Sequence, residues 1–174
     1  MKKLLYILPI VLLMGFVTPQ QKAKGIVETE AIVLDFDSTG ICLNGIKVSR
    51  EWTSGDIEEH LGEPSGSIKF MKTANYDDLG LGVRYSDEEM HKFKSFVLFF
   101  EKAPEPMQKF VGNVNFFGEE IDFKQSITGL YHQFEDKGMQ MDAEKQNCKM
   151  RVNTCTVEIS YINGKLNLIL LTQN

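Results

Sequence analysis

The apolar and polar positions first alternate over 31–36, with the period of a half-buried β-strand. A turn at 38–40 and a short apolar segment at 41–43 follow. Asn44-Gly45 is a strong signal for a two-residue hairpin, because both positions tolerate positive φ, and the chain returns over 46–48. This part of the chain is therefore predicted to form a β-meander.

A helix is predicted over 54–61, because both its start and its end carry sequence signals. Thr53 is placed as the N-cap and Asp56 as the third helical residue, which is close to a capping box. Gly62 follows the last helical residue, and Pro64 prevents the helix from continuing. These signals define both boundaries of the helix.

A second, amphipathic helix is predicted over 126–136, where four apolar residues follow the spacing i, i+3, i+4, i+7: Ile127, Leu130, Tyr131 and Phe134. Gly138 ends this helix, and the polar stretch 138–149 is predicted to be a mobile loop. A closing hairpin over 154–171 turns at Asn163-Gly164.

Strands are predicted in most of the remaining chain, at 67–71, 79–85, 95–101 and 109–117. The sequence therefore predicts an α+β domain, an antiparallel sheet with two short helices. A hairpin, a short helix and several strands occur twice in this order, which favours two similar β-hairpin/helix/sheet halves. Few residues match between the halves, so a coincidence of order is the alternative.

The N-terminus has the pattern of a secretory signal, because Lys2 and Lys3 precede an apolar run of 14 residues at 4–17. A spanning helix needs about 17–25 residues, so no stable membrane span is expected. We expect a signal segment at 1–20 and one globular domain over 21–174, exported to the periplasm or the extracellular space. Anchoring by an uncut signal is the alternative.

The chain is acidic, with a net charge of −5. Without residues 1–20 it keeps 17 Lys and Arg against 24 Asp and Glu, a net charge of −7. Nucleic-acid binding needs a basic stripe, which the sequence lacks. The expected partner is another protein, and the acidity favours a basic one, although acidity also serves solubility alone. The first candidates for the contact surface are Asp77, Asp78, Asp87, Glu88 and Glu89.

Three cysteines, Cys42, Cys148 and Cys155, gain importance if the protein is exported, because disulfides persist in oxidising compartments. An odd count leaves at least one thiol without an intramolecular partner. Cys148 and Cys155 could form a disulfide only if the chain reverses near 152–154, where the apolar phase shifts. No histidine lies within ligand spacing of these two cysteines, so neither a metal site nor a cofactor is predicted.

One motif could carry chemistry, the D-x-D-x-T pattern from Asp35 to Thr39. It resembles the first motif of the haloacid-dehalogenase phosphotransferases. That resemblance implies Asp35 as nucleophile, Asp37 as acid and base, and a magnesium ion that bridges carboxylate and phosphate. The later strands do not have the pattern of a parallel α/β sheet, and a turn over 37–40 explains the same residues.

Three other stretches resemble an uncharacterised family of bacterial domains of unknown function: the strand and hairpin at 39–45, the helix with its Leu-Gly-Glu-Pro exit at 56–64, and the Tyr-Asp-Asp-Leu-Gly strand start at 76–81. The resemblance covers about residues 30–130. The same pattern occurs in small envelope modules, some of which bind or inhibit proteins. The resemblance therefore implies interaction and carries over no active-site residue.

These observations favour an exported, non-enzymatic binding or inhibitory module, similar to an immunity protein, that acts through protein contacts. Its contact surface is expected on a sheet face or an acidic loop. Two alternatives stay open: the magnesium-dependent phosphatase, and a small-ligand carrier suggested by the twelve phenylalanines. A pocket is the feature that the carrier requires.

Overall fold

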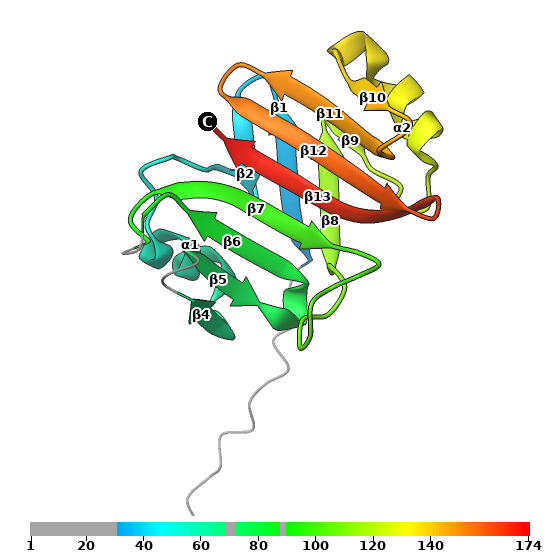
Figure 1. The fold of residues 1–174 in the computed structure, drawn as a ribbon. Coiled ribbons are helices and arrows are strands. Elements are labelled where there is room, and N and C mark those ends of the chain that lie inside the picture. The colour runs from blue at the N-terminus through cyan, green and yellow to red at the C-terminus, as the bar shows by residue number, and fades with distance from the viewer. Residues whose placement is uncertain (1–30, 69–71, 88–89) are drawn as a thin grey trace, which may run out of the picture. The chain divides into compact units, whose positions relative to one another are not determined.

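The computed structural model describes residues 31–68, 72–87 and 90–174, and their strands form two sheets (Figure 1). The smaller sheet, sheet A, has five strands in the order β3-β2-β1-β8-β9. Its central pair, β1 and β8, is parallel, and its other pairs are antiparallel. The bounds are β1 Ile32–Asp37, β2 Gly40–Leu43, β3 Ile46–Lys47, β8 Gly112–Phe116 and β9 Glu119–Glu120.

The larger sheet, sheet B, has eight strands in the order β10-β11-β12-β13-β7-β6-β5-β4, and every neighbouring pair is antiparallel. Its outer face is turned toward the viewer in Figure 1, with sheet A behind it. The bounds are β4 Gly66–Ile68, β5 Thr73–Tyr76, β6 Leu81–Tyr85, β7 Phe93–Phe99, β10 Gln140–Asp142, β11 Asn147–Val152, β12 Cys155–Ile162 and β13 Lys165–Gln173.

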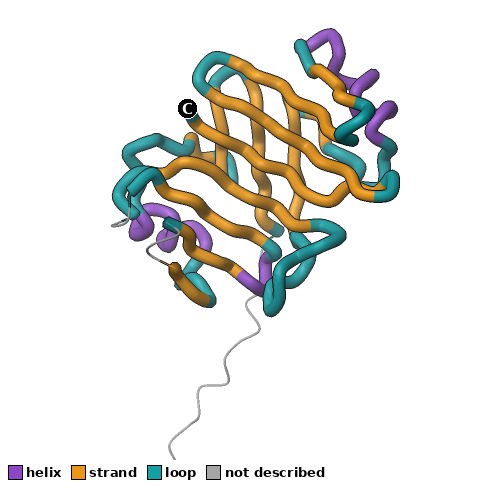
Figure 2. Tube along the Cα trace, in the orientation of Figure 1, coloured by secondary structure: helices purple, strands orange, loops and turns teal. Residues whose placement is uncertain are grey.

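Two short α-helices accompany the sheets, α1 at Ser54–Leu61 and α2 at Ile127–Phe134, with single 3-10 turns η2 at Asp77–Leu79 and η3 at Glu135–Lys137. The bounds of α1 agree with the sequence prediction. Its capping box is confirmed, because the Thr53 side chain accepts a bond from the Asp56 N–H while the Asp56 carboxylate accepts from the Thr53 N–H at 2.6 Å. The loops and turns lie mainly at the ends of the strands (Figure 2).

One apolar core lies between the inner faces of the two sheets. Alternation along β1 buries Leu34 and Phe36 fully. Helix α1 adds Ile57, and α2 adds Leu130 and Phe134, whose ring packs edge-on against Phe116 at 5.7 Å between centroids. Residues 31–174 thereby form one compact unit.

The coarse fold class is confirmed, because the structure is mostly antiparallel sheet with two short helices. Two details of the prediction are wrong. There are two sheets rather than one, and they include a parallel pair. The stretch 138–149 is not a loop, because β10 and the first half of β11 pair within it. Its polar residues occupy positions near the edge of sheet B, where strands tolerate them.

The predicted signal segment at 1–20 lies outside the described residues. Within the part of the chain that the structure describes, no helix has the length and apolar character needed to cross a membrane.

Candidate functional site

The two aspartates of the D-x-D-x-T motif have structural partners. Asp35 lies at the centre of β1 on the outer face of sheet A, where its carboxylate accepts a 2.8 Å hydrogen bond from the Asn115 amide. Asp37 ends β1 and accepts bonds from the N–H and the hydroxyl of Thr39, which hold its pKa below the ordinary value. Asp37 thus forms the turn that leads into β2.

Three of the five acidic residues proposed as a contact surface lie in the described part of the chain, and these three do not gather in one place. Asp77 and Asp78 lie in η2 before β6, whereas Asp87 follows the other end of that strand. The five residues of β6 span about 17 Å, so the two groups are well separated. Asp87 also accepts a 2.8 Å bond from the His91 N–H, which closes its turn. Glu88 and Glu89 lie outside the described residues.

The two candidate disulfide partners are both free thiols. The chain does reverse, with a turn at 153–154, and Cys148 and Cys155 lie on the adjacent strands β11 and β12. However, Cys148 pairs with Ile159 and Cys155 with Val152, so the cysteines are four ladder positions apart. That is about 13 Å, twice the Cα separation that a disulfide spans. The structure does not bring these sulfurs to bonding distance.

The outer face of sheet B carries an apolar patch, which simple alternation of apolar and polar residues along the strands does not predict. Two antiparallel pairs at its centre, Val97 with Leu170 and Phe99 with Leu168, place four apolar side chains on this face. We call these four residues the outer apolar block. Val97 is buried, and the other three are half-buried. Most other strand positions on this face are polar or glycine, with Ile162 at the end of β12 as an apolar exception; the polar and glycine positions include Thr73, Asn75, Gly82, Arg84, Ser95, Thr156, Glu158, Ser160, Lys149, Arg151 and Thr172.

A pocket of about 320 Å³ lies beside the outer apolar block. Gly82 forms part of its floor, and the Phe99 ring comes within 3.7 Å of where a Gly82 side chain would begin. The segment 100–111, which we call the β7–β8 loop, walls the pocket with Pro104, Pro106 and Met107. On the other side of the block, a hollow of about 130 Å³ reaches Ser160.

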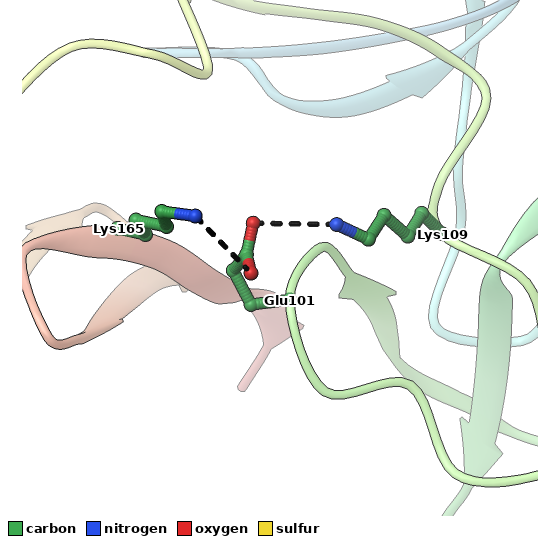
Figure 3. Close-up of polar contacts among 3 residues, drawn as sticks. All are labelled: Glu101, Lys109 and Lys165. Atoms are coloured by element: carbon green, nitrogen blue, oxygen red, sulfur yellow. Dashed lines mark hydrogen bonds and ion pairs between the residues drawn. The ribbon is translucent and has the colours of Figure 1, made fainter.

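A second pocket, of about 410 Å³, lies where the β7–β8 loop, the segment after β9 and the β12–β13 turn meet. We call it the lysine-rimmed pocket. Its only carboxylate is Glu101, which forms ion pairs with Lys109 at 3.3 Å and Lys165 at 4.0 Å (Figure 3). The lining residues are Phe100, Glu101, Lys109, Phe110, Phe123, Lys124, Gly164, Lys165 and Leu166.

Sequence reasoning missed both surface features, although one of them left a signal. The runs Phe96–Phe100 and Leu168–Leu171 are continuously apolar rather than alternating. Such runs are typical of strands with two apolar faces, and they could have identified the outer apolar block. The lysine-rimmed pocket left no comparable signal, because its residues come from three separate parts of the chain. Among residues 31–68, 72–87 and 90–174, no three His, Cys, Asp or Glu side chains gather as metal ligands would.

Comparison with known proteins places the chain in one family. Residues 33–130, more than half of the chain, match the family described as a domain of unknown function, DUF7738, and the chain belongs to that family. The family resemblance predicted for about residues 30–130 is thereby confirmed. The chain matches no curated protein and no solved structure.

The matched range ends inside α2, but the folded unit continues. Strands β10 to β13 lie beyond it, and β13 pairs directly with β7 at the centre of sheet B. The outer apolar block therefore straddles the boundary, with Val97 and Phe99 inside the matched range and Leu168 and Leu170 beyond it.

Proposed function

We propose that this chain is an exported, non-enzymatic binding module with an inhibitory, immunity-like role, and that it contacts its protein partner through the outer face of sheet B. The outer apolar block is the observation that carries the proposal. A sheet face open to water normally presents polar side chains, so adjacent apolar pairs at its centre are a candidate anchor for a partner. The hollows on both sides give room for partner side chains.

The sheet edges support docking by the face rather than by strand addition. The edge strands β3 and β9 have two residues each, and β4 and β10 have three. Such short edges offer few free backbone groups to an incoming strand. The face is the larger surface on which a partner can bind.

Charges on this face indicate the chemistry of the partner. Arg84, Lys149 and Arg151 are exposed on the outer face of sheet B. Glu158 is the acidic residue among the positions directly opposite them on the neighbouring strands. Lys149 forms an ion pair with Glu158, and Arg84 shares the pocket beside the block with Asp77 and Glu105. The charges around the block are therefore mixed, and we propose an apolar partner surface bordered by basic residues, as the net charge of the whole chain favours.

We also propose that the domain consists of two similar halves. In support, β1–β3 precede α1 and β4–β7 follow it, while β8–β9 precede α2 and β10–β13 follow it. The last strands of the two halves, β7 and β13, pair with each other. On this proposal the outer apolar block lies on the seam between the halves.

The contact surface can be tested with a photo-crosslinking residue placed at Ser160, beside the block, or at Asn113, on sheet A, in cells of the organism that makes the protein. We expect a complex of one discrete mass from Ser160 and none from Asn113. The double variant Leu168→Thr/Leu170→Thr should abolish this complex, because the apolar anchor is lost. The matched control is Ile46→Thr, which changes an exposed apolar residue of β3 and should leave the complex intact.

Three outcomes would overturn the proposed surface: no discrete complex from Ser160, equal complexes from both positions, or a complex that survives the double leucine change in a folded variant. Unfolding midpoints of all variants establish that they are folded. Export is tested separately by mass spectrometry of the N-terminus of the protein in the envelope fraction. A mature chain that begins near residue 21 is expected, and a full-length chain confined to the cytoplasm would refute export.

A further inference from the structure

The lysine-rimmed pocket has an apolar floor built from three phenylalanine rings. Phe100 contacts Phe123 at 4.6 Å and Phe110 at 5.9 Å between ring centroids, and the Phe110–Phe123 distance is 6.3 Å. Phe100 and Phe110 are 7% exposed, whereas Phe123 is half-buried. Part of one aromatic ring is therefore available to an apolar ligand, and the other two rings support it.

The rim of the lysine-rimmed pocket carries a net positive charge, although the whole chain is acidic. Lys109, Lys124 and Lys165 line the pocket with a single carboxylate, Glu101, so its charged residues sum to +2 in a chain of net charge −5. The side chains of Lys109 and Lys165 are 64% and 71% exposed, and the contact between Lys165 and Glu101 is at the limit of an ion pair. Both ammonium groups can therefore turn toward a new anion at little cost.

We propose that the lysine-rimmed pocket binds a small organic anion, one with a ring-sized apolar body and a carboxylate at one end. The apolar body lies against Phe123 and Leu166, and the carboxylate takes the place of Glu101 between Lys109 and Lys165. A volume of about 410 Å³ accommodates a molecule with a single ring. This site is separate from the outer apolar block, so it adds a ligand to the proposed function and does not depend on it.

Glu101 has a defined role in this proposal. Its two carboxylate oxygens face Lys109 and Lys165, as a ligand carboxylate would, so it competes with the ligand for the same cations (Figure 3). The rim is thus arranged around a carboxylate even without ligand. Removal of the Glu101 charge should strengthen binding of an external anion, because the lysines lose their internal partner.

The probe is 3-phenylpropionate, titrated into residues 21–174, the chain without the proposed signal segment, while backbone amide NMR shifts are recorded. Two matched probes separate its parts: 3-phenylpropan-1-ol has the ring without the charge, and propionate has the charge without the ring. We expect saturable shifts at residues 100–111, 123–124 and 164–166, with a Kd of about 1 mM for a ligand of this size. Each matched probe should bind about tenfold more weakly or not at all.

Variants test the rim directly. Glu101→Gln should lower the Kd for 3-phenylpropionate about two- to fivefold, and Lys109→Met/Lys165→Met should raise it by about the same factor or more. The control Lys145→Met removes an equally exposed lysine on the β10–β11 turn and should leave the Kd unchanged.

The proposal fails if 3-phenylpropionate gives no saturable shift up to about 10 mM, ten times the expected Kd. It also fails if 3-phenylpropan-1-ol binds as tightly as 3-phenylpropionate, because the lysines would then contribute nothing to binding. Unchanged affinity in both Glu101→Gln and the double lysine variant would show that the rim has no role. None of these results bears on the crosslinking test at Ser160.

Discussion

Gly80 is expected to be intolerant of any side chain, because its backbone and its surroundings both exclude one. It lies in the left-handed region at φ +64, directly after η2. A Cβ added there would lie 2.2 Å from the Phe110 nitrogen and 2.3 Å from the Lys109 carbonyl carbon, both backbone atoms. The β7–β8 loop packs against Gly80 at this point, and the Val111 N–H also donates a hydrogen bond to the Leu79 carbonyl at 3.1 Å.

The size of the effect follows from two contributions. A left-handed conformation costs a residue with a Cβ about 1–2 kcal/mol relative to glycine. Displacement of packed backbone adds about 1–3 kcal/mol, the usual range for overpacking. Gly80→Ala should therefore lower the free energy of unfolding by about 2–5 kcal/mol, which corresponds to a loss of about 5–15 °C in Tm for a domain of this size.

Gly118→Ala is the matched control. Gly118 also has positive φ, +81, but no atom lies within 4 Å of the position where its Cβ would be. It should lose only the strain contribution, about 1–2 kcal/mol. Urea unfolding followed by the fluorescence of Trp52, the only tryptophan, measures both variants. Equal losses in Gly80→Ala and Gly118→Ala would refute the close approach of the β7–β8 loop to Gly80.

Three further predictions concern other parts of the molecule. Native protein treated with iodoacetamide should be alkylated at Cys42 alone, and slowly, because burial and the nearby charges of Asp37 and Asp35 raise the pKa of this half-buried thiol. Cys148 should not react in the native protein, because it is buried and burial raises its pKa to about 11. Intact mass spectrometry should show three modified thiols only after unfolding. Thr53→Ala should cost about 1 kcal/mol at pH 7 through the lost cap. Hydrogen bonds from the Thr53 N–H and hydroxyl hold the pKa of Asp56 below its ordinary value. Thr53→Ala removes only the hydroxyl bond, so part of its cost should disappear in urea titrations as the pH falls below about 4, and a cost independent of pH would refute a contribution of that bond to the charged carboxylate. Wild type and Asp35→Asn should both show only background turnover of a phosphate ester with magnesium, because the Asp35 carboxylate accepts a hydrogen bond from Asn115 within sheet A. Turnover that Asp35→Asn abolishes would establish the phosphatase instead.

Elements specified by local signals could be predicted from the sequence. The bounds of α1 depend on Thr53, Asp56 and Gly62, which act within a few residues of the helix. The turns at Asn44-Gly45 and Asn163-Gly164 form for the same reason, since all four residues have positive φ as the hairpin signal requires.

Elements that depend on distant partners could not be predicted in this way. Strand β10 forms because β11 lies beside it, and the parallel pair of β1 and β8 joins segments about 80 residues apart, as Asp35 and Asn115 illustrate. The lysine-rimmed pocket combines Lys109, Lys124 and Lys165, which no sequence spacing relates. The separation of Asp77 from Asp87, by contrast, already followed from the strand predicted at 79–85, because the two residues flank opposite ends of it.

The position of β13 also determines when the domain can fold. This strand lies between β7 and β12, so sheet B stays divided into a three-stranded part, β10 to β12, and a four-stranded part, β4 to β7, until residues 165–173 have been made and have left the ribosome. Pairing at such sequence separation is intrinsically slow. Until β13 arrives, Phe96 and Leu98 of β7 lack their neighbours Leu171 and Ile169. The continuous eight-stranded sheet, and with it the outer apolar block, can therefore form only after the last of its strands has been made.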